Sequence, residues 1–260
     1  MADFFKNASE RAGSLSIMES GLLDYSLKNL HLVKNMSIRK FAAANYVSTS
    51  TVIRFLKKMG YEGWSAFRTA IIEAESENRS ITIPTVVTKD NYRESYMKNV
   101  VEAIRVLPED KIEQFDQIMS RYPKTYILGE GFSREVGHYL YRLLKVSGYD
   151  CEFPQNDYEM NSLLRRIKRE DVVIILSFSG ENLSVIGQVQ KILSIATPTL
   201  ISITRADNNT IQNMSDINFY VFADEIRYDN MDVTSRCGMI AILELLMYRR
   251  ITHQNQSQLG

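Results

Sequence analysis

The sequence has 260 residues, of which 45% are hydrophobic and 24% are charged, and its acidic and basic side chains balance to a net charge of zero. This composition is typical of a globular protein with one large domain or two smaller ones, and it excludes a uniformly basic surface. The 2 cysteines are too few for a disulfide framework or a four-cysteine zinc site, and no apolar run is long enough to span a bilayer.

Helical patterns fill the chain up to residue 77: a leucine-rich stretch at residues 22–34, two short helices, and a further helix led by Trp64 and Phe67. Residues 75–90 are polar and β-branched, with one proline and no helical or alternating period. We therefore predict a helical domain at residues 1–77, a linker at residues 78–90, and a second domain at residues 91–260.

Within the helical domain, two short helices separated by a tight turn are predicted between Ser37 and Gly60. Ser37 is suited to cap the first helix and Ser48 or Thr49 the second, and Gly60 can end the second in a left-handed conformation. The outer face of the second helix is polar and positive, as base edges and phosphates require of a recognition helix. We predict that its DNA contacts come from Ser48, Thr49, Ser50, Thr51, Arg54, Lys57 and Lys58.

The local charge also favours DNA. Residues 31–68 contain seven basic side chains against one acidic side chain, Glu62, although the whole chain is neutral. Phosphate is the natural partner of such a patch. The alternative interpretation is a solvated face of a small helical bundle that binds no DNA.

Five short apolar runs follow the linker and alternate with segments of helix length. They read TYILG, DCEF, DVVIILS, TLISIT and NFYVF, beginning at residues 125, 150, 171, 199 and 218. Continuous apolar runs indicate strands that are buried on both faces, covered here by helices at residues 135–146 and 182–193, among others. We predict an α/β domain with a five-stranded parallel sheet flanked by helices, of the doubly wound type.

Two serine-containing turns, SFSGEN at residues 177–182 and GEGFS at residues 129–133, follow two of these strands. Ligands bind beyond the carboxyl ends of parallel strands, where helix N-termini attract anions. Ser177 and Ser179 offer hydroxyl groups to a phosphate, and Gly180 lets the backbone approach it. Gly131 and Ser133 lie at the same sheet edge, where we expect sugar hydroxyls. The alternative is that each turn only caps its helix.

The stretch VSTSTVIRFLKKMGYEGWSAFR resembles the helix-turn-helix of the RpiR family of bacterial regulators, whose pattern runs Val-Ser, Thr-Val, Arg-Phe, then two Gly-aromatic pairs and Phe. The second half resembles the sugar isomerase (SIS) domain of that family, a flavodoxin-like fold, in GEGFS, SFSGEN, LISIT and TSRCGMIAILELL. Asn182 stands where the phosphate turn commonly has threonine. The resemblance implies that Asn182 and Glu225 face the ligand.

Our first hypothesis is therefore a transcription regulator, implied by the resemblance to be a repressor of sugar or amino-sugar metabolism genes. Its partners would be operator DNA and a phosphorylated sugar, and it would act as a homodimer or homotetramer on a two-fold operator. The second hypothesis is a sugar-phosphate isomerase or lyase with an accessory helical domain, and the third is a protein-binding module that regulates an enzyme. The sequence identifies neither the sugar, the genes nor the direction of control.

No catalytic residue, metal site or cofactor is predicted. Isomerisation needs a base beside the carbonyl, and none of the 3 histidines or the acidic residues near strand ends stands out as one. The N-terminus lacks the apolar core of a signal peptide, so we expect the protein to be cytoplasmic.

Overall fold

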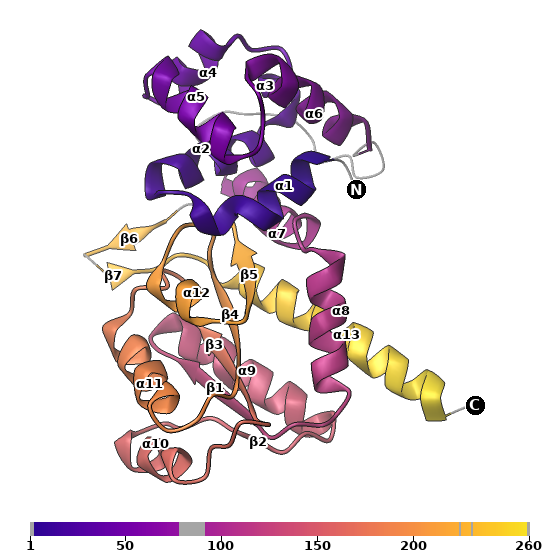
Figure 1. Ribbon diagram of the computed structural model, residues 1–260, viewed down its shortest axis with the longest axis vertical. Coiled ribbons are helices and arrows are strands. Elements are labelled where there is room, and N and C mark those ends of the chain that lie inside the picture. Colours follow the sequence, from indigo (N-terminus) through magenta and orange to yellow (C-terminus); the bar gives the residue numbers. More distant parts are fainter. Residues whose placement is uncertain (1–2, 78–91, 224, 230, 259–260) are drawn as a thin grey trace. The chain divides into compact units, whose positions relative to one another are not determined.

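The computed structural model describes residues 3–77, 92–223, 225–229 and 231–258 (Figure 1). The chain divides into two compact units, one made of Met1–Pro108 with Ala206–Asn208, the other of Glu109–Arg205 with Asn209–Gly260. Helix α7 (Tyr92–Arg105), which the sequence assigned to the second domain, thus groups with the first unit. The predicted linker at residues 78–90 lies outside the described residues.

The first unit is helical, as predicted. Before α7 it contains α1 (Asp3–Arg11), a short 3-10 turn (Ala12–Ser14), α2 (Ile17–Lys28), α3 (Leu30–Val33), α4 (Ile38–Ala44), α5 (Thr49–Lys58) and α6 (Trp64–Glu77). The leucine-rich stretch contributes to two helices, α2 and α3, because Asn29 leaves the helical region with φ −129° and ψ 35°.

An aromatic core holds this unit together. Phe67 of α6 is fully buried, and its ring contacts five other rings at centroid distances of 5.2–6.2 Å: those of Phe4, Phe41, Phe55, Tyr61 and Trp64. Aromatic pairs at this spacing and tilt stabilise the fold by more than the apolar area they bury would account for. The core fixes α4 and α5 against α6, so that the opposite faces of α4 and α5 are left to solvent.

The predicted caps of α4 and α5 are confirmed. The Ser37 hydroxyl accepts from the Lys40 amide, and the Ser48 hydroxyl accepts from the Thr51 amide. Tyr46, in the turn between the helices, has φ 55°, and Gly60 after α5 has φ 82°. Each left-handed residue directly follows the C-cap of a helix, Tyr46 that of α4 and Gly60 that of α5, so the two residues end these helices.

The second unit has the predicted α/β fold. After α8 (Glu109–Met119) come β1 (Thr125–Gly129), α9 (Phe132–Val146), β2 (Cys151–Glu152), α10 (Asp157–Leu164), β3 (Val172–Leu176), α11 (Leu183–Leu193), β4 (Thr199–Arg205), α12 (Thr210–Met214) and β5 (Ile217–Val221). The strands are parallel in the order β2-β1-β3-β4-β5. The short antiparallel pair β6 (Arg227–Tyr228) and β7 (Met231–Asp232) precedes the last helix, α13 (Cys237–Gln258).

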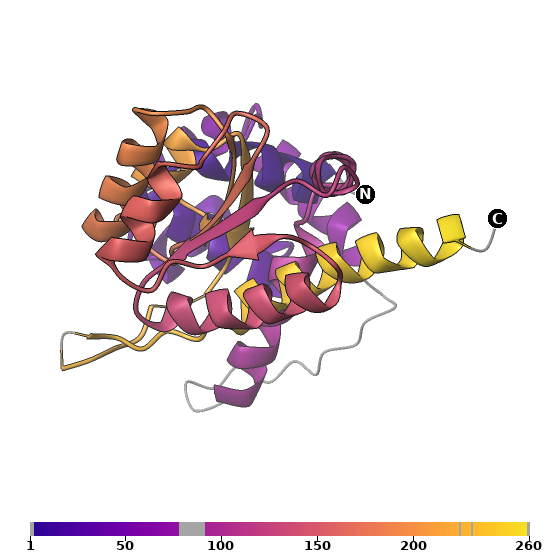
Figure 2. The same cartoon turned by 90° about the horizontal axis from the view of Figure 1, so that it is seen from below.

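Helices cover both faces of the sheet. Tyr126, Val173 and Leu200 share one face and pack with α10, α11 and α12 into one apolar cluster. On the other face lie α8, α9 and α13 (Figure 2). There Phe115 of α8 packs against Phe219 of β5. Since β1 and β3 are adjacent and parallel, their carboxyl ends lie side by side, and the two serine-containing turns follow them directly.

Candidate functional site

The first candidate site is the outer face of α5. Ser48, Thr49 and Ser50 at its start are exposed, and so are Arg54 and Lys57 one and two turns later. In the described part of the chain, no carboxylate lies within ion-pair distance of Arg54 or Lys57. Two cations are therefore presented to solvent without a counter-ion, which suits them to the phosphates and base edges of DNA.

Three hydroxyl groups form a cluster at the start of α5. The Ser48 oxygen lies 2.7 Å from the Ser50 oxygen and 2.9 Å from the Thr51 oxygen, while it also accepts from the Thr51 amide at 3.1 Å. The helix-cap interpretation of Ser48 is thus satisfied in the structure. The cap and the DNA-contact roles are compatible, because the hydroxyls of Ser48 and Ser50 remain exposed.

Lys58 differs from its neighbour Lys57. Its ammonium group lies 2.6 Å from the carboxylate of Glu19, which belongs to the capping box of α2. Burial raises the pKa of Glu19, but hydrogen bonds from Lys58 and Ser16 outweigh it and leave the pKa below its usual value. Lys58 is therefore committed to a contact within the helical unit, although the sequence places it on the DNA-binding face.

The second candidate site is a cavity of about 500 Å³ at the carboxyl ends of β1 and β3. It is formed by three segments that each precede a helix: the turn before α9, the turn before α11, and the segment from β7 to α13. Five of the predicted ligand residues line it, namely Gly131, Ser133, Ser177, Ser179 and Asn182. Its other lining residues are Glu130, Phe132, Glu135, Leu176, Phe178, Val185, Met231, Asp232 and Arg236.

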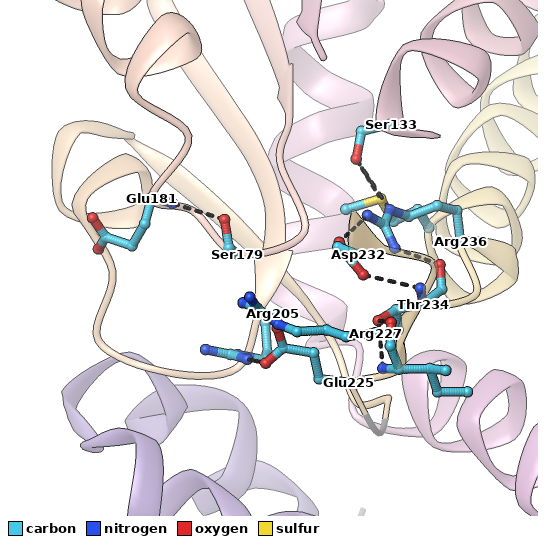
Figure 3. A network of polar contacts seen from close by, with 11 residues as sticks. Ser133, Ser179, Glu181, Arg205, Glu225, Arg227, Asp232, Thr234 and Arg236 are labelled. Carbon is cyan, nitrogen blue, oxygen red and sulfur yellow. Dashed lines mark hydrogen bonds and ion pairs between the residues drawn. The ribbon is translucent and has the colours of Figure 1, made fainter. Parts of the chain in front are cut away.

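The turn before α11 has the geometry of an anion site. Asn182 caps α11 by accepting from the Val185 amide at 3.1 Å. Figure 3 shows the Ser179 hydroxyl, which accepts from the Glu181 amide at 3.2 Å. The described residues supply no acceptor for the backbone N–H groups of Ser179 and Asn182. These amides, with the positive end of the helix dipole, are available to a phosphate.

Gly180 is required by the shape of this turn. Its φ is 66°, and a Cβ atom there would lie 2.0 Å from the side-chain oxygen of Asn209. Asn209 is itself buried and caps α12, and the Glu181 carboxylate accepts from the Thr210 amide at 2.7 Å. The turn is thus braced from behind by α12, so that its free amides are held in position.

Arg236 forms part of the cavity wall and makes several polar contacts there. It donates to the Ser133 hydroxyl at 3.2 Å, to the Thr234 carbonyl at 2.5 Å and to the Asp232 carboxylate at 2.5 Å (Figure 3). Its guanidinium carbon lies 4.6 Å from the centre of the Phe178 ring. Burial raises the pKa of Asp232, but the hydrogen bonds from Thr234 and Arg236 outweigh it and bring the pKa below its usual value.

The other carboxylates near the cavity are placed differently. Glu130 pairs with Arg134 at 3.1 Å, whereas Glu135 on the first turn of α9 is exposed. Glu225, which the family resemblance placed at the ligand, does not line the cavity: it pairs with Arg205 at 3.2 Å and Arg227 at 2.7 Å. Gly180 also lies outside the lining, since it shapes the turn from behind.

Sequence reasoning missed Arg236 and Asp232. A signal was present, because a cation directly before a long helix opposes the helix dipole. The Arg236 carbonyl accepts the first helical bond of α13, from Ile240, so the arginine stands at the N-cap position where Ser, Thr, Asp or Asn is preferred. An arginine there needs a local counter-ion, and the sequence offers one four residues earlier in Asp232.

Neither cysteine forms a disulfide bond, and the described residues contain no group of three His, Cys, Asp or Glu side chains placed to hold a metal ion. Among the helices that the structure describes, none combines the length and the apolar character needed to cross a membrane.

Comparison with known families agrees with this architecture. The model of the helix-turn-helix domain of the rpiR family matches residues 6–78, and the SIS domain model matches residues 118–247. The chain belongs to the RpiR family. The prediction of that family from the sequence is thus confirmed, and α5 is the second helix of its helix-turn-helix.

Solved structures share the fold of the whole chain or of part of it. The NanR protein of Vibrio vulnificus, solved in complex with ManNAc-6P, has a TM-score of 0.56 and 18% identity over 98% of this chain and 94% of that one. The sugar isomerase domain of an RpiR transcription factor from Sphaerobacter thermophilus has a TM-score of 0.55 and 15% identity over 63% of this chain and 89% of that one. A Methanococcus jannaschii protein, inferred to be a 3-hexulose-6-phosphate isomerase, has a TM-score of 0.51 and 17% identity over 63% and 90%. At these identities the likeness shows a shared fold.

Proposed function

We propose that this RpiR-family protein is a transcription regulator whose affinity for operator DNA is controlled by a phosphorylated sugar bound in the cavity of its SIS domain. One observation carries the proposal: a single chain combines an exposed basic recognition helix with a cavity whose serine turn presents unbonded amides. A regulator needs both features, whereas an isomerase has no use for the first.

The DNA-binding part is supported by the exposed face of α5. Arg54 and Lys57 lack counter-ions in the described residues, and the hydroxyls of Ser48 and Ser50 stand at the helix start, where a recognition helix meets base edges. We propose that Arg54 contacts a base and that Lys57 contacts a phosphate. The ion pair with Glu19 makes Lys58 a weaker candidate than the sequence suggested.

The effector part is supported by the turn before α11. Ser179, its own amide and the amide of Asn182 offer hydrogen bonds to one anionic group, and the cavity has the size of a small-ligand site. The structural neighbour NanR was solved with a phosphorylated sugar, ManNAc-6P, which supports this ligand class.

Control then follows from linkage. A ligand changes DNA affinity only to the extent that it binds the DNA-competent and the DNA-incompetent states differently. We further propose that the protein binds a two-fold operator as a homodimer or homotetramer, because one recognition helix makes few base contacts. Light scattering that gives a monomeric mass with and without effector would exclude this assembly.

The competing function is an isomerase, since the fold is shared with a protein inferred to be one. No histidine lines the cavity, all of whose lining residues the structure describes, and its carboxylates Glu130 and Asp232 are engaged in ion pairs. Glu135 is the remaining carboxylate of the cavity lining, and in an isomerase it would be the candidate for the base that moves the proton. Conversion of hexose phosphates by the purified protein would support this alternative against a purely sensing role.

The decisive experiment titrates the operator complex with candidate sugar phosphates, comparing the parent with Ser179→Ala. Loss of one charge-assisted hydrogen bond should weaken the effector response about tenfold to a hundredfold and leave DNA affinity without effector unchanged. Ser194→Ala, at the other end of α11, is the matched control and should respond like the parent. If Ser179→Ala also responds like the parent, the turn only caps its helix and the sensing site lies elsewhere.

A further inference from the structure

Arg236 is fixed in the cavity wall by contacts from three separate segments. Ser133 comes from the turn before α9, Phe178 from the turn before α11, and Asp232 from β7. The arginine side chain is only 10% exposed. Since each contact restrains a different part of the guanidinium, its planar fork is held in one orientation before any ligand arrives.

This arrangement is costly for the fold. A buried cation loses its hydration, and its place before α13 opposes the helix dipole. A serine or aspartate at that position would cap α13 and need no counter-ion. Asp232 offsets the charge, but an ion pair with a buried partner is often no more stable than a well-packed apolar pair. The pair therefore calls for an explanation outside the packing of the domain.

The pair also keeps unused hydrogen-bonding capacity at the cavity. A guanidinium has five N–H groups, and three are engaged here, by Ser133, Thr234 and Asp232. The Asp232 carboxylate accepts from the Thr234 amide and from Arg236, and its side chain is 32% exposed. Both residues line the cavity, so one wall presents N–H donors beside carboxylate lone pairs.

Hydrogen-bond donors and acceptors that lie side by side suit a ligand that carries hydroxyl groups. A hydroxyl group both donates and accepts, so two neighbouring ring hydroxyls can take a hydrogen bond from Arg236 and give one to Asp232. A second anionic group on the ligand would be repelled by Asp232, and an ammonium group by Arg236. The wall is therefore matched to a neutral polyhydroxyl face.

We propose that the Arg236–Asp232 pair is the specificity-determining element of this site, binding two adjacent hydroxyls of the sugar while the turn before α11 holds its phosphate. The inference rests on the proposed function. It divides the cavity into a phosphate end, formed by Ser179 and the amides, and a hydroxyl-reading end, formed by the pair.

The test measures binding of inorganic phosphate, glycerol phosphate and a panel of hexose 6-phosphates by calorimetry, with no DNA present. The panel contains glucose 6-phosphate, 2-deoxyglucose 6-phosphate, mannose 6-phosphate and N-acetylmannosamine 6-phosphate. The parent should bind its best hexose phosphate at least about tenfold more tightly than inorganic phosphate. The double variant Arg236→Met/Asp232→Asn, which leaves no unpaired buried charge, should lose that preference about tenfold to a hundredfold while its affinity for inorganic phosphate changes less than about twofold.

Ser179→Ala is the complementary control and should weaken all phosphates alike. The milder variant Arg236→Lys keeps the charge but loses the fork, so it should retain the fold and lose most of the preference; its thermal unfolding and that of the double variant are measured in parallel.

The possible outcomes distinguish failure of the proposed effector site from failure of the specificity role of the Arg236–Asp232 pair. If the parent binds neither inorganic phosphate nor any hexose phosphate, the proposed effector site itself is wrong. If it binds phosphate but prefers no hexose phosphate, or if the folded double variant or Arg236→Lys keeps the preference, the specificity role is overturned and the phosphate site stands. If Arg236→Lys loses inorganic phosphate as strongly as sugar phosphate, Arg236 is a phosphate ligand and the role proposed for the pair is equally overturned.

Discussion

Each candidate site contains an arginine, and the two arginines differ in exposure and in ion pairing. Arg54 on α5 is exposed, and the described residues give it no ion-pair partner. Arg236 in the cavity is 10% exposed and bound to Ser133, Thr234 and Asp232. A guanidinium without a counter-ion attracts a polyanion from a distance, whereas a guanidinium that is already neutralised and fixed can only read the geometry of a small ligand at contact.

The different environments of the two arginines predict different responses of the two sites to salt. Exposed charges are screened over about 10 Å at 0.1 M salt, and every phosphate contact on DNA releases a counter-ion. Paired charges in a cavity are screened much less. Operator affinity should therefore fall steeply as salt rises, while sugar recognition should be nearly insensitive to it beyond the effect on the phosphate itself.

The largest effect should follow from Gly180→Ala, which removes the rigidity on which the cavity depends. The new Cβ meets Asn209 and the left-handed φ costs roughly 1 to 3 kcal/mol, so effector affinity should fall about tenfold to a hundredfold or more. Effector titration and urea unfolding measure the two losses. Gly187→Ala in α11, where a Cβ meets nothing within 4 Å, is the control and should stabilise the fold slightly. Equal behaviour of the two variants would contradict the account of a braced turn.

Arg54→Ala tests the exposed half of the comparison. If Arg54 reads a base, operator binding should weaken by about 1 to 3 kcal/mol and the base preference at one position should flatten. Fluorescence anisotropy with operator and single-base variants of it provides the measurement. Arg68→Ala, which removes an exposed arginine from α6, is the control. A similar loss in both variants would mean that only net charge matters.

A buried carboxylate in α7 is an exception to the contrast between exposed charge in the helical unit and buried charge in the cavity. Glu102 is 3% exposed and lies 2.6 Å from Arg105, and burial raises its pKa to about 7. The folded state thus binds a proton more tightly than the unfolded state, so stability should fall as pH rises from the usual value of 4.5 towards 7. The slope contributed by one group is at most about 1.4 kcal/mol per pH unit.

Glu102→Gln should remove that part of the pH dependence. Urea unfolding at pH 5 and pH 8 measures it, with the exposed Glu62→Gln as the control that keeps the parental slope. A parental slope in the Glu102 variant would mean that the carboxyl group ionises as readily in the folded state as in the unfolded state.

The smallest effect separates two neighbouring lysines. Lys57→Ala should weaken binding to all DNA alike and reduce the slope of log affinity against log salt by about one unit. Lys58→Ala should leave that slope unchanged, because Lys58 is paired with Glu19, and should instead lower stability slightly at neutral pH, where Glu19 is ionised, with no difference from the parent at acid pH. The pairing holds the pKa of Glu19 low and so stabilises the fold above its unfolded pKa, a benefit that is lost as pH falls. Equal salt slopes in the two variants would contradict the assignment.

The sheet and the helix-turn-helix could be predicted because their signals are local. A buried strand such as Val172–Leu176 is a continuous apolar run, and Ser48 and Gly60 mark the limits of α5 by cap and backbone preference. The sequence does not mark the break at Asn29, because the leucine pattern continues through it. The pair β6 and β7 was missed because strands of two residues each are too short to show any period.

The cavity was only half predictable for a different reason. The serine turns are read directly from the chain, since each follows a strand. The position of Arg236 depends on contacts with Ser133 and Phe178, which lie 103 and 58 positions away, and no pattern within one segment reports such contacts. The family resemblance included the segment TSRCGMIAILELL but gave Arg236 no role. Of the two residues that it placed at the ligand, Asn182 lines the cavity, whereas Glu225 pairs with Arg205 and Arg227.

The hydroxyl cluster at the start of α5 has a consequence for the operator. The Ser48 hydroxyl contacts the hydroxyls of Ser50 and Thr51, and each of the three can rotate its proton towards or away from its neighbour. A base that offers an acceptor and a base that offers a donor can therefore both be met by turning the same protons, with no movement of the backbone. We expect the operator consensus to be degenerate at the base that faces Ser50 and strict for guanine at the base that faces Arg54, whose fork can only donate.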